Sequence, residues 1–315
     1  MTDRTLVVAI GGNSLIKDAR HQTVPDQIAA LGQTSIHIAA AIRDGWRVAI
    51  GHGNGPQVGF ILRRSELAAH ELHDVPLDVC DADTQGAIGY ELQQSLGNDF
   101  RRLGFERKAV TVVTQVEVAR DDPAFQHPSK PIGTFMDEAR AAQRHQEEGW
   151  TVVEDAGRGW RRVVPSPRPL RIVEEDAVLA LLHDGFIVIT VGGGGIPVVA
   201  DEGGCLHGVA AVIDKDFASS LLATVVKADV FAITTAVERV ALDWGKPSQT
   251  WVDQLTADEA RGYLAEGTHF MPGSMAPKIE ACLQFLDRGG SDAIICAPSD
   301  LELALRGKAG TRIVH

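Results

Sequence analysis

LVVAIGG, residues 6–12, is a short apolar run that ends in two glycines. A run of five apolar residues before a glycine turn predicts a strand that is buried on both faces of a sheet. Pro25 then opens a predicted helix, and Gly45 closes it. Four apolar side chains recur on one side of this helix: Ile28, Leu31, Ile38 and Ile42. Together with the next apolar run, residues 48–50, these segments form a right-handed crossover unit.

The same rhythm continues along the chain. Further short apolar runs alternate with amphipathic helices at residues 110–113, 187–191, 230–233 and 293–296. This alternation is typical of a parallel sheet that is covered by helices on both faces. The 315 residues, 44% of them hydrophobic, suit one large α/β domain, residues 1–315, with an inserted subdomain.

Residues 118–170 interrupt the pattern. This segment is rich in proline and contains a basic cluster at residues 158–168. We interpret it as a small subdomain that protrudes from the main domain, although a decorated loop would have a similar composition. A long excursion from a compact domain is usually functional or disordered, so the functional interpretation is a lid. Lys130, framed by prolines in HPSKPIG, would then be a charge delivered by a stiff arm.

Composition excludes several classes of protein. A formal charge of −12, with no long run of lysine and arginine, argues against nucleic acid as a partner. The N-terminal apolar run is too short for a signal peptide or a membrane span, so we expect a cytoplasmic protein. The four cysteines are far apart and show no metal-ligand spacing, which predicts no metal or redox role for them.

Three glycine turns follow predicted strands. The first contains Gly11, Gly12 and Asn13, the second contains Gly53, Asn54 and Gly55, and the third covers residues 192–195. Glycine lets backbone N–H groups approach an anion closely, and asparagine adds an amide donor. Ligands of open α/β sheets bind at the carboxyl ends of the strands, so these turns should open onto one crevice.

The segment VIDKDF, residues 212–217, places Lys215 between Asp214 and Asp216 at a predicted helix start. Carboxylates keep a lysine charged, and the helix N-terminus adds positive partial charge, so phosphate would be favoured there. Lys278 also lies near a predicted helix start, although a solvated surface lysine is the ordinary interpretation of either residue alone. The P-loop and dinucleotide fingerprints are both missing, so the lysines and glycine turns together predict phosphoryl transfer by another fold.

Eight segments resemble the carbamate kinases of the amino acid kinase superfamily, and they extend from residue 6 almost to the last predicted strand. They are AIGGNSL, GHGNGPQVG, TQGAIGYELQ, DPAFQHPSKPIG, EDAGRGWRRVVPSPRP, VGGGGIPV, GVAAVIDKDFASSLLA and GSMAPKIEA. The resemblance implies a three-layer αβα sandwich around a largely parallel sheet of about eight strands, with a protruding subdomain, and a homodimer. It also implies reversible transfer of the γ-phosphoryl group of Mg-ATP to carbamate, giving carbamoyl phosphate and ADP.

The resemblance also assigns roles to individual residues. Its catalytic residues would be Lys130, Lys215, Asp216 and Lys278. Substrate and phosphate would be held by Gly11, Gly12, Asn13, Gly53, Asn54 and Gly55. The nucleotide would contact Asp214, Thr235, Ala236, Gly273 and Met275. Mg²⁺ would be held mainly by phosphates and water, so no protein ligand is assigned to it.

Departures from the wider superfamily help to separate the alternatives. Ile10 replaces a lysine that many relatives outside the carbamate branch carry, which favours that branch, while Ala241 and Thr134 replace a common aromatic residue and a common proline. A related acyl or phosphonate kinase is a second hypothesis, but no extra arginine stands beside the second glycine turn. A non-catalytic nucleotide sensor is a third, and it would be expected to lose one of the predicted catalytic residues. The resemblance suggests arginine metabolism, but the sequence leaves the pathway and the direction of flux open.

Overall fold

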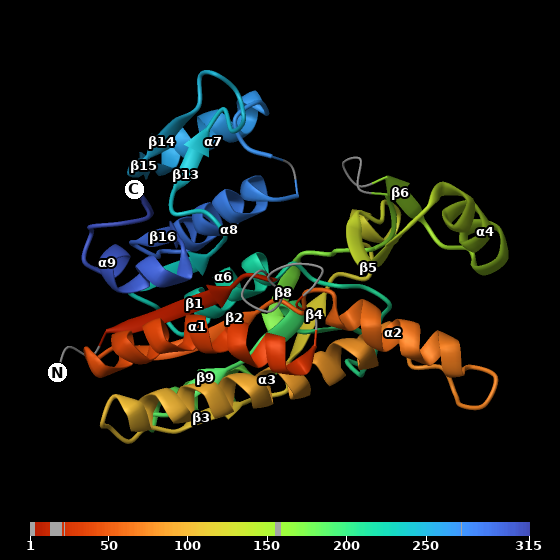
Figure 1. The fold of residues 1–315 in the computed structure, drawn as a ribbon, viewed down its shortest axis with the longest axis horizontal. Coiled ribbons are helices and arrows are strands. Elements are labelled where there is room, and N and C mark those ends of the chain that lie inside the picture. Colours follow the sequence, from red (N-terminus) through yellow and green to blue (C-terminus); the bar gives the residue numbers. More distant parts are fainter. Residues whose placement is uncertain (1–3, 13–20, 22, 155–158, 272) are drawn as a thin grey trace.

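The computed structural model describes residues 4–12, 21, 23–154, 159–271 and 273–315. Its largest sheet has eight strands in the order β15-β17-β16-β12-β1-β2-β9-β3 (Figure 1). Their bounds are β1 Thr5–Ile10, β2 Arg47–His52, β3 Ala109–Thr111, β9 Ile187–Ile189, β12 Val230–Thr234, β15 Gln254–Thr256, β16 Ala293–Cys296 and β17 Thr311–Val314. All neighbouring pairs in this sheet are parallel except β16 and β17. The predicted, largely parallel α/β sheet is therefore confirmed.

Strand β1 shows why this sheet forms at the centre of the molecule. Leu6, Val8 and Ile10 enter one apolar core, and Val7 and Ala9 enter the other, all of them fully buried. Complete burial of a large aliphatic side chain contributes about 1.5–3 kcal/mol, so both faces of the strand favour the sheet interior. The apolar sequence of residues 6–10 follows directly from this position.

Helices cover both faces of the sheet and complete three layers (Figure 1). One face packs against α1 Val24–Arg43, α3 Leu77–Arg102 and the short α9 Leu301–Leu305. The other packs against α5 Glu175–His183, α6 Lys215–Val225, α7 Ala257–Glu266 and α8 Met275–Asp287. Thr23 caps α1 in a capping box with Asp26, so the helix begins one residue before the predicted Pro25.

A second, smaller sheet has the order β11-β10-β4-β8. Its strands are β4 Gln115–Val118, β8 Pro169–Ile172, β10 Ile196–Ala200 and β11 Leu206–Gly208. A hairpin of β13 Val240–Leu242 and β14 Thr250–Val252 follows β12. Short 3₁₀ turns occupy Pro123–Phe125, Gly192–Gly194 and Pro298–Asp300.

The excursion at residues 118–170 leaves the small sheet after β4 and returns to it at β8. Between them lie β5 Lys130–Met136, α4 Glu138–Glu148, β6 Val152–Glu154 and β7 Trp160–Val164. The strands form an antiparallel sheet, β5-β7-β6, which lies beside α4 and away from the main sheet (Figure 1). Its base is held by Ile132 and Val164, which share an apolar cluster with Val58 of α2 Gln57–Ala68.

Two glycines set the distance between this excursion and α2. A Cβ atom added to Gly59 of α2 would overlap the backbone of Gly133 in β5. The two backbones can approach so closely only because Gly59 has no side chain. A Cβ on Gly133 would lie 3.9 Å from Cα of Gly59, an ordinary contact, but its φ of 71° favours glycine. No helix in the described part of the chain is long and apolar enough to cross a membrane.

Candidate functional site

The N-terminus of α6 is the centre of the site. Asp214 is its N-cap, and its Oδ1 accepts the backbone N–H of Asp216 at 2.9 Å. An acidic side chain at this position satisfies one of the free N–H groups of the first turn. The cap leaves Lys215 and Asp216 on the first turn of the helix, where the backbone dipole is positive.

Three lysines and two carboxylates meet at this helix start. Asp216 is 2% exposed and is paired with two ammonium groups: Lys215 Nζ bonds Oδ1, and Lys278 Nζ bonds Oδ2 at 2.9 Å. Lys130 Nζ bonds Asp214 Oδ2 at 2.6 Å. Three positive and two negative charges leave a net charge of +1. The cluster can therefore accept an additional anion.

The shifted pKa values agree with this arrangement. Burial opposes ionisation of Asp216, but attraction by Lys215 and Lys278 outweighs it and lowers the pKa of this carboxyl. Burial lowers the pKa of Lys215, whereas attraction by Asp216 outweighs burial at Lys278 and raises its pKa. The two lysines differ because Lys215 is the more deeply buried, so the cost of burial prevails there. Asp216 thus stays ionised between them.

The first two glycine turns lie next to each other, as the sequence predicts. The backbone N–H of Gly53 donates to the carbonyl of Ile10 at 3.1 Å, and a Cβ added to Gly12 would lie 3.8 Å from Cα of Gly55. A Cβ on Gly53 would be 3.1 Å from Cδ of Lys215, so the lysine side chain passes directly beside this turn. Asn13 lies outside the described residues.

The third glycine turn packs against the second turn and against the residue before the N-cap of α6. A Cβ added to Gly194 would overlap the carbonyl of Ile213, and one added to Gly193 would lie 3.0 Å from Nδ2 of Asn54. Both glycines have positive φ angles, 101° and 69°, which glycine adopts at little cost. This turn therefore packs against the residue before Asp214 and against the second turn.

The second glycine turn is held by two buried residues, His52 and Asp81, that the sequence did not predict as part of the site. Asn54 donates from Nδ2 to Oδ1 of Asp81 at 2.8 Å, and His52 bonds through Nδ1 to the carbonyl of Gly53 at 2.9 Å. Burial lowers the pKa of His52 to about 4, so the imidazole is neutral at pH 7. Burial raises the pKa of Asp81 well above its ordinary value, despite the hydrogen bond from Asn54. Asp81 could have been recognised from the sequence, because its carboxylate lies on the buried face of α3.

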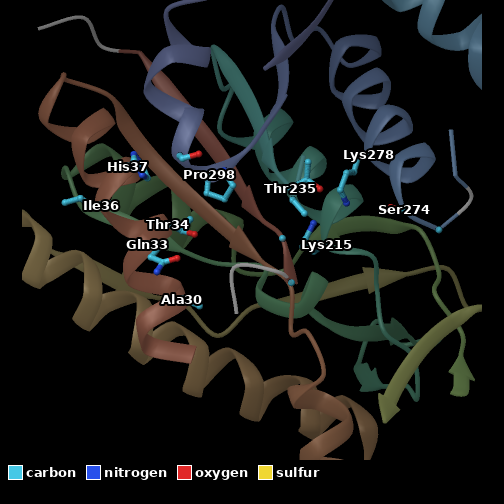
Figure 2. Close-up of a pocket in the computed structure, with 15 residues that line it drawn as sticks. Ala30, Gln33, Thr34, Ile36, His37, Lys215, Thr235, Ser274, Lys278 and Pro298 are labelled. Atoms are coloured by element: carbon cyan, nitrogen blue, oxygen red, sulfur yellow. The ribbon is translucent and has the colours of Figure 1, made fainter. Parts of the chain in front are cut away.

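A cavity of about 590 Å³ opens beside this cluster (Figure 2). Seven predicted residues line it: Gly11, Gly12, Lys215, Thr235, Ala236, Gly273 and Lys278. The Lys215, Lys278 and Thr235 side chains gather on one side, and Gln33 and Thr34 of α1 lie on the other (Figure 2). Met275 packs, partly buried, against the apolar core instead.

The described residues contain no group of three or more His, Cys, Asp and Glu side chains that could hold a metal ion. Asp214 and Asp216 are both engaged by ammonium groups. A divalent cation at this site would therefore rely on oxygen ligands from phosphate and water.

The fold and the cluster define a class: an α/β protein whose site for anionic ligands lies at the carboxyl end of a parallel sheet. A sequence profile described as the amino acid kinase family matches residues 4–297. The chain therefore belongs to the amino acid kinase family.

Individual relatives place the chain more closely within this family. It is 50% identical to a carbamate kinase-like protein of Escherichia coli, with 98% of each chain covered. It is 47% identical to a carbamate kinase of Thermococcus kodakarensis, with 99% of each covered. The solved carbamate kinase of Giardia lamblia bound to AMP-PNP matches with a TM-score of 0.91 and 38% identity, covering 99% of both chains. The resemblance to carbamate kinases is thus confirmed.

Proposed function

We propose that this protein is a carbamate kinase, which transfers the γ-phosphoryl group of Mg-ATP reversibly to carbamate. The observation that carries the proposal is the pairing of Lys215 and Lys278 with the single buried carboxylate of Asp216 beside two glycine turns. Similarity to the Thermococcus kodakarensis enzyme supports the choice of substrate.

Catalysis would rest on position and charge. A phosphoryl group in transfer spreads negative charge over its equatorial oxygens, and Lys215 and Lys278 would stabilise that charge from fixed positions. Asp216 would orient both ammonium groups without touching the phosphate. The backbone N–H groups of Gly11, Gly12, Gly53 and Gly55 would add neutral donors, together with the Asn13 and Asn54 amides. Carbamate is already an anion, so the reaction needs no general base. Direct transfer between two substrates bound side by side would involve no covalent intermediate.

Lys130 would act from the excursion at residues 118–170, which we propose to be a lid. In the described structure Lys130 pairs with Asp214, and its side chain is 31% exposed. An anionic substrate would compete with Asp214 for this ammonium group. Closing the excursion over the substrate would thus transfer the third positive charge of the cluster from Asp214 to the substrate.

The nucleotide would lie beside Lys278, on the side of the cavity formed by Thr235, Ala236 and Gly273. Of the other two residues predicted to contact it, Asp214 is the N-cap of α6, and Met275 begins α8 but packs against the apolar core. The Giardia lamblia relative binds AMP-PNP, a nucleotide analogue. Mg²⁺ would arrive with the nucleotide and keep phosphate and water as its main ligands. A homodimer, a cytoplasmic location and a place in arginine metabolism complete the proposal.

A coupled assay of ATP formation from carbamoyl phosphate and Mg-ADP tests this function. Acetyl phosphate and acylglutamyl phosphate serve as competing phosphoryl donors. We expect a kcat/KM at least about a hundredfold higher with carbamoyl phosphate, because the small site would exclude the larger donor and fit the amide. Preference for either control would assign a related acyl kinase, and no ATP from any donor would favour a non-catalytic role.

A further inference from the structure

A second cavity, of about 460 Å³, lies away from the lysine cluster, between α2 and the excursion at residues 118–170. Its walls come from α2 on one side and from β5, α4 and β7 on the other. Figure 1 shows α4 and β5 in the part of the excursion that lies above α2. A cavity of this size suits a small organic molecule. We call it the junction cavity.

The junction cavity is lined by an excess of positive charge. Its arginines are Arg63, Arg140, Arg144 and Arg162, and its acidic residues are Glu66 and Asp137. Four positive charges against two negative ones leave +2 among the lining residues, or +1 when Glu148, which is paired with Arg144, is also counted. The whole chain carries −12, so this excess is contrary to the overall charge.

One carboxylate, that of Glu66, serves two of these arginines. Its Oε2 lies 2.9 Å from Nη1 of Arg63 and 3.8 Å from Nη2 of Arg144. Arg144 is also paired with Glu148, one turn further along α4. Glu66 therefore links α2 to the excursion as a counterion that both sides share.

The other two arginines lack a close carboxylate among the described residues. Arg140 is exposed, and only its backbone N–H is engaged, by Oδ1 of Asp137 at 2.8 Å. Arg162 is half-buried and lies over the Trp150 ring, with its guanidinium carbon 4.7 Å from the ring centroid. Burial lowers the pKa of Arg162, and attraction by Glu66 only partly offsets this.

Trp150 positions two guanidinium groups at once. Arg144 lies over the same ring at 5.0 Å, so two planar donor groups are held at one aromatic side chain. Contact with an aromatic face orients a guanidinium group without using its N–H donors. The N–H donors of Arg162 therefore remain suited to the paired oxygens of a carboxylate or a phosphate, whereas those of Arg144 face Glu66 and Glu148.

We propose that the junction cavity binds a small organic dianion, a dicarboxylate or a phosphate monoester, which competes with Glu66 for Arg63 and Arg144. Such a ligand would join α2 to the excursion through oxygens of its own. Strand β5 begins at Lys130 and continues into the cavity wall at Ile132 and Gly133. Occupancy of the cavity would therefore also fix the strand that carries Lys130.

The test is calorimetric titration of the full-length protein with two probes, succinate and glycerol 3-phosphate. We expect saturable binding of at least one probe, and the probe that binds identifies the oxygen chemistry. Binding should also change tryptophan fluorescence in the wild type but not in Trp150→Phe. A phosphate monoester held at the catalytic lysines would not need the arginines or Trp150.

Three variants separate a ligand site from a structural ion-pair cluster. Arg140→Gln should weaken binding about tenfold, the usual effect of losing one charge-assisted hydrogen bond. Arg107→Gln, at another exposed arginine, should leave it unchanged. Glu66→Gln removes the competing carboxylate and should tighten binding about tenfold. The proposal is overturned if neither probe saturates, or if Arg140→Gln matches Arg107→Gln and Glu66→Gln binds no more tightly than the wild type.

Discussion

Two ion-pair systems meet at the start of α6, and they differ in where their lysines come from. Lys215 and Lys278 belong to the main body, and their side chains are only 11% and 14% exposed around Asp216. Lys130 comes from the excursion, and it and Asp214 are 31% and 19% exposed. The buried system is enclosed by the core, whereas the outer pair is within reach of solvent, and, against the cost of burial, attraction by Lys130 lowers the pKa of Asp214. In the proposed function, the buried system of Lys215, Lys278 and Asp216 is a fixed floor, and the excursion that carries Lys130 is a movable arm.

The largest loss of activity is expected from a substitution in the buried ion-pair system. Lys215→Met is expected to lower kcat about a thousandfold, because it removes a preorganised charge beside the phosphoryl group. Lys308→Met, at an exposed lysine far along the chain, is the matched control and should keep wild-type activity. Steady-state kinetics with carbamoyl phosphate and Mg-ADP provides the measurement. A Lys215→Met enzyme with more than a tenth of wild-type kcat would refute the charge assignment.

The titration of His52 tests whether the residues beneath the second glycine turn are as firmly buried as Asp216. Its pKa in the folded protein is about 4, lower than the ordinary value of about 6.5 for an unfolded chain. Protonation therefore favours unfolding: this part of the stability is complete above pH 6.5 and is lost as the pH falls toward 4.

Denaturant unfolding at pH 7 and pH 4.5 measures this loss. We expect His52 to account for about 2–3 kcal/mol of the difference in the free energy of unfolding, at about 1.4 kcal/mol per pH unit. His52→Gln should lose correspondingly less stability between the two values. An equal loss in both proteins would show that His52 titrates normally.

The contact between Gly59 and Gly133 tests how firmly the arm is seated. Gly59→Ala should lower the free energy of unfolding by about 2 kcal/mol, because the new methyl group overlaps the β5 backbone. Gly86→Ala in α3 is the control, since a Cβ there meets nothing within 4 Å, and it should be neutral or slightly stabilising. Equal thermal unfolding of the two variants would mean that the arm moves aside freely.

The smallest effect is expected at the arm itself. Lys130→Met should raise KM for carbamoyl phosphate about tenfold while changing kcat less, because a partly exposed charge contributes mainly to substrate binding. Lys108→Met, also exposed, is the control. A kcat loss as large as that of Lys215→Met would place Lys130 in the floor and end the distinction between the two regions.

The sequence reveals the centre of the fold better than its edge. Strands such as β1 and β12 are apolar except for one terminal threonine each, because both of their faces are buried, and this pattern is readable. At one side of the sheet, the edge strand β15 and its neighbour β17 have the sequences QLT and TRIV, which are short and mixed, and the sequence did not predict either of them. The opposite edge strand, β3, overlaps the predicted apolar run at residues 110–113. An edge strand needs less apolar surface, so its pattern is weaker.

The residues of the site also fall into those that the sequence predicts and those that it does not. Glycine turns and lysines at helix starts are local signals, and they predicted which residues would gather at one edge of the sheet. The Lys130–Asp214 pair spans 84 positions in sequence and depends on how the excursion docks. The supports of Asn54 and the junction cavity likewise depend on packing between distant segments, which one sequence does not reveal.

Strands β4 and β8 pair antiparallel, with Val116 opposite Ile172 and Val118 opposite Pro169. The excursion thus starts and finishes at neighbouring backbone positions, about 5 Å apart as in any antiparallel pair. A tight turn could join the same two strands, so the main body does not depend on the excursion for its connectivity. Evolution could therefore lengthen, trim or replace this module while the phosphate-facing floor beneath it kept its architecture.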